Sequence, residues 1–347
     1  MGQPDLAMDA GGYAFLRDFS VTVVDNASTD GVIDYLRQHH PEVVILRNAR
    51  NLGFARAHNQ AIALARARWS KRFHGINHET GDQYVLVTNP DLILESDFLE
   101  CLVAAADTHP ESGSVGGKLL KIVAERAGDV LVAPRQTNII DSTGLKIGRS
   151  RRVVERGAGE EDQGQYSGGR VFGISGALAL YRVSALDDVR FDDEYFDDDF
   201  FAYKEDIDLA WRLQLRGWQA WYDPRAVAYH YRAAAGSVRR TPLVALRERH
   251  KKSAFVNFLS TRNHLLLLWK NDDWSNRFRH LLWIVPYELG RLLLVIFTEP
   301  RTFTAYLSAL RLLPRMREKR AYSLSIRKIS PAEFRTWLCN PTSPSSS

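Results

Sequence analysis

The chain has 347 residues, of which 45% are hydrophobic and 25% are charged, so it can bury one large core or two modest ones and is globular. Its two cysteines, Cys101 and Cys339, have no His or Cys neighbours at ligand spacing, which excludes a disulfide framework and a zinc site and fits a reducing cytosolic setting. The net charge of +5 hides an asymmetry, because residues 231–347 hold 21 Lys and Arg against 7 Asp and Glu, whereas residues 1–230 hold 25 against 34. We interpret two parts of opposite sign as parts with two different roles.

The sequence does not predict a simple membrane anchor. No charged and then apolar leader opens the sequence, so we expect no cleavable signal peptide. The longest apolar stretch, Leu281 to Phe297, is interrupted by Pro286, Glu288 and Arg291, which makes it a poor candidate for a simple span.

A strand, a polar turn and a helix follow a short N-terminal segment, residues 1–19, that contains no clear strand. Ser20 to Val24 favours a strand, and helical spacing begins at Val32, which predicts the first half of a βαβ unit. Ligands in such sheets collect at the carboxyl ends of strands, so Asp25 is a candidate ligand contact. Ser28, Thr29 and Asp30 follow, and the alternative to a ligand contact for them is N-capping of the helix. We prefer this alternative for Thr29 and Asp30.

A second strand, Glu42 to Arg47, precedes the segment from Asn51 to Ala57 and a helix that extends to about Ala67. The small residues Gly53, Ala55 and Ala57 allow the backbone to approach a flat or tightly packed group. Tight packing of the helix on a sheet explains them nearly as well.

A third strand, Tyr84 to Thr88, ends at Asn89, Pro90 and Asp91. Asn89 and Asp91 place two oxygen donors on one side of an extended segment, as hard divalent ions prefer. Taken alone, this motif is more often a turn than a metal site.

Further elements alternate up to His230. The pattern predicts a helix at 96–106, a strand at 114–121, an irregular charged region with a strand pair and a loop at 124–161, a small-residue turn and buried strand at 171–182, and a strand at 218–230. A lone His at a strand end is usually structural, but His230 follows several strand-end acids and amides in the same predicted sheet.

The segment from Phe191 to Trp218 is the most unusual in the chain. Nine carboxylates lie between Asp192 and Asp208 among six aromatic rings. Because aromatic rings favour burial, we interpret the segment as an acidic pocket at a buried edge rather than a solvated tail.

A helix is predicted from Asp206 to Gly217. Glu205 and Asp206 fall in its first turn, where free backbone N–H groups favour carboxylates, and neighbouring acids there resist ionisation, which suits a general base. For Asp208 we prefer an ordinary ion pair with Arg212 one turn away.

The C-terminal part is basic and helical. Residues 232–252 are predicted to form a basic loop, residues 255–269, 274–297 and 302–313 to form helices, and residues 340–347 to be disordered. Arg and Lys beside Trp and Leu favour helices that lie in a membrane interface. The alternative is a helical cap with a solvated basic face.

Four motifs in this order resemble glycosyltransferase family 2, closest to the rhamnosyltransferase-like subgroup. They are Val24 to Gly31, Asn51 to Ala55, Asn89 to Asp91, and Phe191 to Glu194 continuing to Glu205 to Leu209. The resemblance implies an α/β GT-A fold, Rossmann-like with a mostly parallel central sheet, followed by a basic helical region. It divides the chain into a short segment (1–19), a GT-A domain (20–232), a basic amphipathic helical region (233–339) and a disordered tail (340–347).

The resemblance also implies roles for single residues. Asp25 would meet the nucleobase, with Asn51 and Gly53 also in the nucleotide-sugar site. Asn89 and Asp91 match an Asp-x-Asp motif with the first acid replaced. A divalent cation, Mg²⁺ or Mn²⁺, would be held by Asp91 and His230, Gly176 would border the donor sugar, and Asp206 would be the general base with Glu205 beside it.

The implied activity is inverting transfer of a sugar, best matched by rhamnose, from a nucleotide diphosphate sugar such as dTDP-rhamnose or a UDP-sugar. The acceptor would be a glycan or lipid-linked molecule of bacterial cell-surface polysaccharide synthesis. The positive C-terminal part would hold the enzyme at the anionic inner face of the plasma membrane. No nucleic acid is expected as a partner.

One departure from the family pattern stands at the N-terminus, where the usual strand before Ser20 is not recognisable. Loss of a central strand would expose two ladder edges. A degenerate or truncated transferase that serves as a binding partner is therefore one alternative, and a nucleic-acid binder that uses the basic tail is another. Nucleotidyl transfer is disfavoured because no Gly-rich basic loop follows the first strand.

Overall fold

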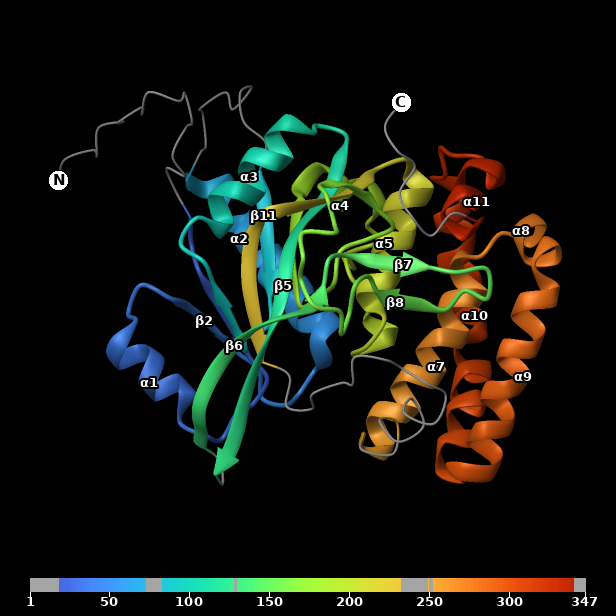
Figure 1. Ribbon diagram of the computed structural model, residues 1–347, viewed down its shortest axis with the longest axis horizontal. Coiled ribbons are helices and arrows are strands. Elements are labelled where there is room, and N and C mark those ends of the chain that lie inside the picture. Colours follow the sequence, from blue (N-terminus) through green and yellow to red (C-terminus); the bar gives the residue numbers. More distant parts are fainter. Residues whose placement is uncertain (1–18, 73–82, 128–129, 232–248, 250–251, 340–347) are drawn as a thin grey trace.

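The computed structural model describes residues 19–72, 83–127, 130–231, 249 and 252–339. The described part combines three β-sheets, the largest of seven strands, with a group of C-terminal helices (Figure 1). The predictions for the N-terminal segment, most of the basic loop and the C-terminal tail, and the predicted boundary at residue 232, lie outside the described residues.

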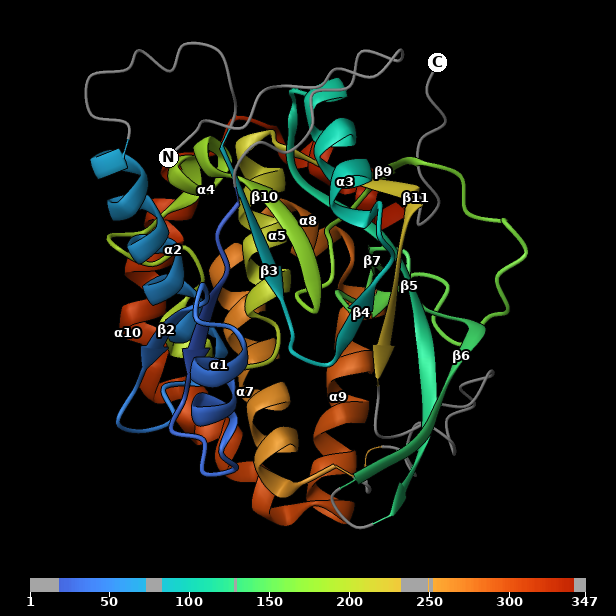
Figure 2. The ribbon, with the colours of Figure 1, turned by 90° about the vertical axis from the view of Figure 1, so that its left-hand side faces the viewer.

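The N-terminal unit is the predicted strand, helix, strand and helix. Strand β1 (Thr22–Asp25) pairs in parallel with β2 (Val44–Arg47), and α1 (Val32–His39) connects them. Helix α2 (Gly53–Arg72) begins at a glycine with a φ of +84°. In Figure 2 this unit lies at one side of the main sheet, with the long β5–β6 pair at the other.

The main sheet is mixed. It has the strand order β3-β10-β5-β11-β4, with β6 on β5 and β9 on β11. The strands are β3 (Tyr84–Thr88), β4 (Leu92–Leu94), β5 (Ser112–Ala127), β6 (Val130–Ser142), β9 (Gly169–Val171), β10 (Leu178–Arg182) and β11 (Gln219–Tyr231). Among its described strands β5 and β11 are the only parallel neighbours, so the predicted mostly parallel sheet is wrong. The apolar runs showed that the strands are buried, but burial alone does not set strand direction.

The β1–β2 sheet and the main sheet are separate in the described residues. There β1 pairs only with β2, and β3 pairs only with β10, so each keeps one edge without a strand partner. Such edges expose backbone N–H and C=O groups.

The region at 124–161 is more regular than predicted. The backbones of β5 and β6 pair in its first half, and β7 (Leu145–Ile147) pairs with β8 (Val153–Glu155) in its second half. Register shifts interrupt the β5–β6 ladder, and these irregularities break the strict alternation that sequence analysis relies on.

The helices are α3 (Phe98–Thr108), α4 (Val183–Val189), α5 (Glu205–Arg216), α7 (Ala254–Asn271), α8 (Trp274–Arg279), α9 (Leu281–Thr298), α10 (Thr304–Ser325) and α11 (Pro331–Cys339), with short 3₁₀ turns at η1 (Asp198–Phe200) and η2 (Pro300–Phe303). Helix α10 continues through Pro314 beyond its predicted end, and the predicted helix at 274–297 divides at His280 into α8 and α9. Helix α11 was not predicted.

The C-terminal helices share a hydrophobic core with α5. Trp211 of α5 is fully buried and stacks on Phe334 of α11, with ring centroids 5.2 Å apart. Leu266 of α7 and Met316 of α10 belong to the same cluster. The two oppositely charged parts therefore pack against each other.

Candidate functional site

A left-handed turn precedes helix α5. Phe201, Tyr203 and Lys204 all have φ between 62° and 73°, a region that side chains other than glycine rarely occupy. The side-chain amide of Asn263 on α7 donates to the carbonyl oxygens of Phe200, Ala202 and Tyr203 at 2.7 to 2.9 Å. Strained backbone of this kind persists where the surrounding structure fixes it, and it concentrates at functional sites.

The turn directs Asp206 toward the glycine turn before β10. Its Oδ2 accepts the backbone N–H of Gly176 at 2.9 Å, and its Oδ1 accepts the N–H of Ile207 at 2.8 Å. Burial raises the pKa of Asp206, although these two N–H groups stabilise its charged form.

Glu205 lies beside Asp206 in a different environment. Its side chain is buried, and within the described part of the chain its Oε2 has no hydrogen-bond partner. Burial first, and then the neighbouring carboxylate of Asp206, raise the pKa of Glu205 to about 8. Because only Asp206 receives backbone N–H donors on both oxygens, it is the member of the pair whose charged form is better stabilised.

Gly176 is required by this close contact. A Cβ at position 176 would lie 2.8 Å from the Cβ of Asp206. We expect Gly176→Ala to displace the Asp206 carboxylate and lower kcat by about 10–100-fold in a transferase assay. Gly290→Ala is the matched control, since its Cβ would meet no atom within 4 Å and should leave kcat unchanged. An unchanged kcat in Gly176→Ala would contradict this role.

Asp91 and His230 lie together where β4 and β11 meet. His230 Nε2 is 3.3 Å from Asp91 Oδ1, and the Tyr231 N–H donates to the carbonyl oxygen of Asp91 at 2.9 Å. The other ring nitrogen of His230, Nδ1, lies 2.8 Å from Oδ2 of the buried Asp141. A proton on Nδ1 would turn the lone pair of Nε2 toward Asp91.

This donor set fits part of a divalent cation site. A carboxylate oxygen beside an imidazole nitrogen can bind Mg²⁺ or Mn²⁺ while phosphate and water occupy the other positions. In the described ranges no group of three or more His, Cys, Asp and Glu side chains has the geometry of a complete metal site. Asp91 and His230 would therefore supply two ligands.

The Asp25 region is a hydrogen-bonded unit at the ends of β1 and β2. Asp25 is buried, accepts the Ser28 N–H at 2.8 Å and lies 3.3 Å from Arg47 Nε. The hydrogen bonds from Ser28, together with Arg47, lower the pKa of Asp25 despite its burial. The N-cap of α1 is Gly31, which has no side-chain oxygen, so the N-capping prediction for Thr29 and Asp30 is wrong; Asp30 instead accepts the N–H of Val32 at 3.2 Å from one position further out.

Asn51 and Gly53 belong to the same unit. Asn51 Oδ1 accepts the Gly53 N–H at 2.8 Å, and Asn26 Nδ2 donates to the Gly53 carbonyl oxygen at 3.2 Å. A Cβ at Gly53 would lie 2.4 Å from the Phe201 carbonyl oxygen, so tight packing accounts for this glycine, although against the turn before α5 and not against a sheet. The contact also joins the Asp25 region to the turn before Asp206.

Asn89 connects the Asn89 to Asp91 motif to the glycine turn before β10. Its backbone N–H donates to the carbonyl oxygen of Ala177 at 2.8 Å, and Ala177 follows Gly176. The structure thus brings the four sequence motifs to one side of the molecule through Gly53 with Phe201, Gly176 with Asp206, and Asn89 with Ala177.

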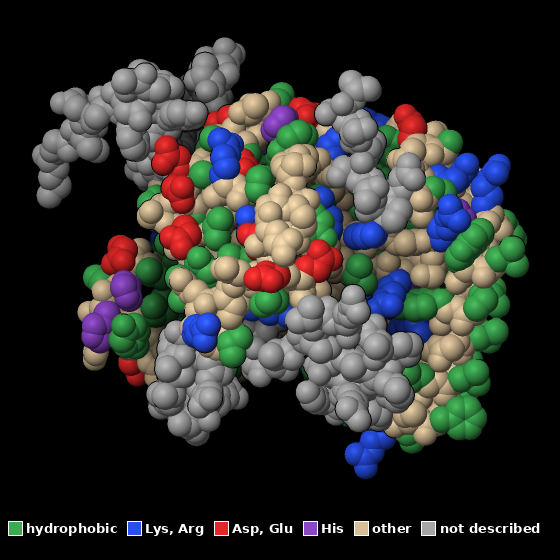
Figure 3. Space-filling view, in the orientation of Figure 1, with side chains coloured by type: hydrophobic (Ala, Val, Ile, Leu, Met, Phe, Trp, Pro, Cys, Tyr) green, Lys and Arg blue, Asp and Glu red, His purple; other side chains and the backbone are tan. Residues whose placement is uncertain are grey.

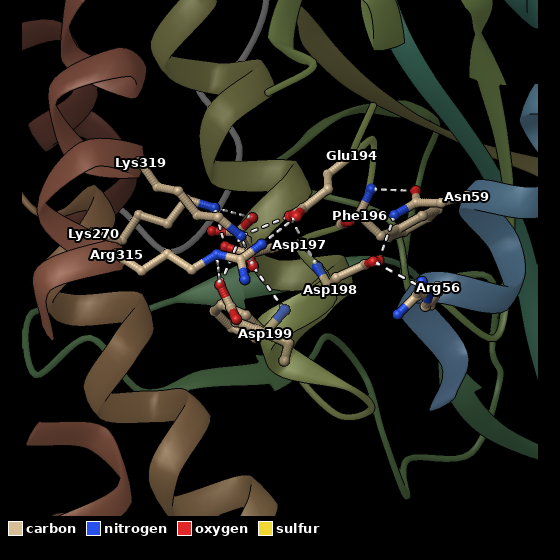
Figure 4. A network of polar contacts seen from close by, with 12 residues as sticks. Arg56, Asn59, Glu194, Phe196, Asp197, Asp198, Asp199, Lys270, Arg315 and Lys319 are labelled. Atoms are coloured by element: carbon tan, nitrogen blue, oxygen red, sulfur yellow. Dashed lines mark hydrogen bonds and ion pairs between the residues drawn. The ribbon is translucent and has the colours of Figure 1, made fainter. Parts of the chain in front are cut away.

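Most carboxylates of the acidic segment belong to a structural ion-pair network instead of an open pocket (Figure 4). Lys319 Nζ contacts Glu194 at 2.6 Å, Asp197 at 2.5 Å and Asp199 at 2.8 Å. Lys270 Nζ bridges Asp197 at 2.7 Å and Asp208 at 2.9 Å. The prediction of an acidic pocket is therefore wrong for these residues, because the basic faces of α7 and α10 neutralise them.

Asp208 also has its predicted partner. Arg212 Nε lies 2.9 Å from Asp208 Oδ2 and both side chains are buried, which confirms the ordinary ion pair. Burial alone would raise the pKa of Asp208, but Lys270 and Arg212 outweigh it and lower that pKa.

Sequence reasoning missed the residues that support the site. Asp141, which contacts His230, lies in the region predicted to be irregular. Asn263 lies on α7, and the turn that it holds lies about sixty residues earlier in the chain. The polar run Thr261 to His264, which interrupts the apolar residues of this helix, is a signal that could have identified it.

Two family models match the chain. The model for glycosyl transferase family 2 matches residues 14–190, about half of the chain, and the model for glycosyl transferase family group 2 matches residues 150–323. Both are consistent with the motif order along the sequence.

Two curated relatives agree with these family models. The chain is 30% identical over 250 residues to the N-acetylglucosaminyl-diphospho-decaprenol L-rhamnosyltransferases of two Mycobacterium tuberculosis strains, CDC 1551 / Oshkosh and ATCC 25618 / H37Rv, over 71% of this chain and 76% of each relative. Among solved structures, GalNAc-T7 with UDP, GalNAc and Mn²⁺ matches with a TM-score of 0.45 and 11% identity over 75% of this chain. The match spans 48% of the GalNAc-T7 chain, about half of its length.

The matched motifs, the α/β architecture and the relatives support one assignment. This chain belongs to glycosyltransferase family 2, with an α/β GT-A-like fold whose main sheet is mixed and which is followed by a C-terminal helical region.

Proposed function

We propose that this enzyme is an inverting, metal-dependent glycosyltransferase that moves a sugar, best matched by rhamnose, from a nucleotide diphosphate sugar to a lipid-linked or glycan acceptor. Such a reaction would belong to bacterial cell-surface polysaccharide synthesis. The observation that carries the proposal is the convergence of Asp206, Gly176 and Asn89 beside the Asp91 and His230 pair.

The donor side would lie along the strand ends. Asp25, held among backbone and side-chain donors, is suited to accept hydrogen bonds from a nucleobase, and the Asn51 to Gly53 backbone lies beside it. Asp91 and His230 would hold the divalent cation, which when bound offsets the charge on the departing diphosphate.

Asp206 would accept the proton of the acceptor hydroxyl. The oxygen of that hydroxyl forms a bond to the anomeric carbon from the face opposite the diphosphate, the bond to the diphosphate breaks with its electron pair, and the anomeric configuration is inverted. Two backbone N–H groups orient Asp206, and a protonated Glu205 beside it adds no competing negative charge.

The acceptor proposal draws on the relatives and on local charge. The names of the mycobacterial relatives specify a diphospho-decaprenol acceptor. In this chain Lys204 directly precedes the carboxylate pair, and Arg291 acts on it closely enough to lower its pKa, after the larger effect of burial, to about 8. A cation directly before the proposed base, with a second cation near the first, suits an acceptor that carries phosphate groups.

Calorimetric titration of dTDP and UDP, each with and without Mg²⁺, would test the donor site. We expect one nucleotide to bind in a metal-dependent way, and Asp91→Ala to weaken that binding by about tenfold or more, since one cation ligand is removed. Asp193→Ala is the matched control because Asp193 is a fully exposed acid, and it should bind like the wild type.

Other outcomes would favour the alternatives. Binding of neither nucleotide would favour a degenerate transferase that serves as a partner of another protein. Salt-dependent binding of DNA without nucleotide binding would favour the nucleic-acid alternative.

A further inference from the structure

Helix α9 has an inner face that contacts the rest of the protein. Ile284, Glu288, Arg291 and Val295 recur at helical spacing along it, and Ile284 and Val295 are buried. Glu288 Oε1 lies 2.6 Å from His264 Nε2 on α7, and its other oxygen lies 3.2 Å from Arg291. Both charges of the helix are therefore engaged on this side.

The opposite side, which we term the outer apolar face, is open to solvent. It consists of residues that are 45% to 82% exposed, namely Leu282, Val285, Leu289, Leu293, Ile296 and Phe297. These positions also recur at helical spacing and form a continuous stripe. Figure 3 shows the stripe as hydrophobic side chains along the right-hand edge, over the position of α9 in Figure 1.

This face is too apolar and too large for an ordinary exposed helix. Among the described helices α9 is the one that is long and apolar enough to cross a membrane by length and composition, yet only 11% of it is buried. Its 18 residues form a stripe about 27 Å long. Exposed apolar surfaces of this kind mark interaction sites.

The residues at the two ends of the stripe indicate what covers it. At the N-terminal end Trp283 lies under the Arg149 guanidinium, 4.9 Å from its ring centroid, and Arg279 is exposed nearby in sequence. At the C-terminal end Arg301 is exposed. Arg at both ends of an uncharged stripe, with Trp at one of them, is typical of helices at the headgroup level of a bilayer. Such cations also complement anionic lipid headgroups.

We propose that the outer apolar face of α9 docks onto an anionic lipid bilayer, with the helix lying in the interface and not crossing it. Crossing would place Glu288 and Arg291 in hydrocarbon and remove them from α7. The proposal rests on the proposed function, because it places Lys204 and the proposed base Asp206 on the protein side of a helix whose other side contacts lipid. The phosphate-bearing part of a lipid-linked acceptor is found at that level of a membrane.

Cosedimentation of the full chain with phosphatidylcholine vesicles, with and without about 30% phosphatidylglycerol, tests the proposal. We expect binding that increases with phosphatidylglycerol. The triple variant Leu282→Gln, Leu289→Gln and Leu293→Gln should lower the partition coefficient by at least about tenfold. The matched control replaces three exposed apolar residues elsewhere, Val32→Gln, Tyr35→Gln and Val123→Gln, and should bind like the wild type.

A second readout does not depend on the triple variant. In a background with Cys101→Ser and Cys339→Ser, an environment-sensitive fluorophore on Leu289→Cys should shift to the blue on addition of vesicles, whereas one on Val123→Cys should not. No shift at position 289, or equal vesicle binding by both triple variants, would overturn the proposal. A dimer in vesicle-free buffer that only the α9 variant dissociates, without vesicle binding, would also overturn it in favour of a second copy as the occupant.

These outcomes are separable from the proposed function. Vesicle binding without binding of dTDP or UDP would contradict the donor site and leave the docking surface supported. Metal-dependent nucleotide binding without vesicle binding would contradict the surface alone.

Discussion

Replacement of Asp206 by Asn is expected to lower kcat by about 10²–10⁴-fold, the usual contribution of a positioned general base. The amide keeps the size of the side chain but cannot accept the proton of the acceptor hydroxyl. The measurement is the initial rate of sugar transfer at saturating donor, with calorimetric nucleotide binding as the check that the donor site is intact. A rate within about threefold of the wild type would exclude Asp206 as the base.

Glu205→Gln is the informative comparison for Asp206→Asn. Because the pKa of Glu205 is raised to about 8, its protonated form resembles Gln at neutral pH, and this variant should keep most of its activity. Because the pKa of Glu205 is higher in the folded protein than its ordinary value of 4.5, its contribution to stability is complete below pH 4.5 and decreases as the pH rises from there toward 8. Thermal unfolding of Glu205→Gln should therefore depend less on pH over this interval than that of the wild type.

Lys319→Met is expected to lower the free energy of unfolding by about 3–5 kcal/mol, the largest stability loss that we predict for a single substitution. Burial alone would lower the pKa of Lys319, but Asp197 and its neighbours raise it, so the side chain stays charged inside the protein. Its loss would leave Glu194, Asp197 and Asp199 close together with less compensating charge (Figure 4). Urea unfolding monitored by circular dichroism measures the effect.

Arg317→Met is the matched control for Lys319→Met. Arg317 is exposed on the same helix, and its replacement should change the free energy of unfolding by less than about 0.5 kcal/mol. The double variant Lys319→Met with Asp197→Asn should lose less stability than the sum of the two single variants, because the second change removes a negative charge that the first leaves uncompensated. Additive losses would show that the network does not couple these residues.

The sequence predicted those parts of the site that depend on local pattern. Asp91 and His230 follow from their positions at strand ends, and Asp206 follows from the start of an apolar-patterned helix; the structure places Asp91 beside His230 and Asp206 beside Gly176. The local alternation of apolar and polar residues gives only the positions of these residues at strand ends and at a helix start, and their roles came from the resemblance to the family.

The parts that were missed depend on contacts between distant segments. The acids at 194–199 read as a pocket because their partners, Lys270 and Lys319, lie on helices whose docking cannot be read from the acidic segment itself. The prediction of strand direction in the main sheet was wrong for a related reason. Strand β10 lies between β3 and β5, although many residues separate it from both in the chain. Helix α10 passes Pro314 because its second half supplies Arg315 and Lys319 to the same network.

The amide of Asn263 sets an order of events during protein synthesis. It holds the carbonyl oxygen of Phe200, 63 residues earlier in the chain, and so fixes the turn that aims Asp206. A ribosome must therefore complete α7, and release it from the exit tunnel, before this turn can take its final shape. The nascent domain thus emerges without this turn in its final shape, and Asp206 takes its place beside Gly176 only when the helical region has followed it.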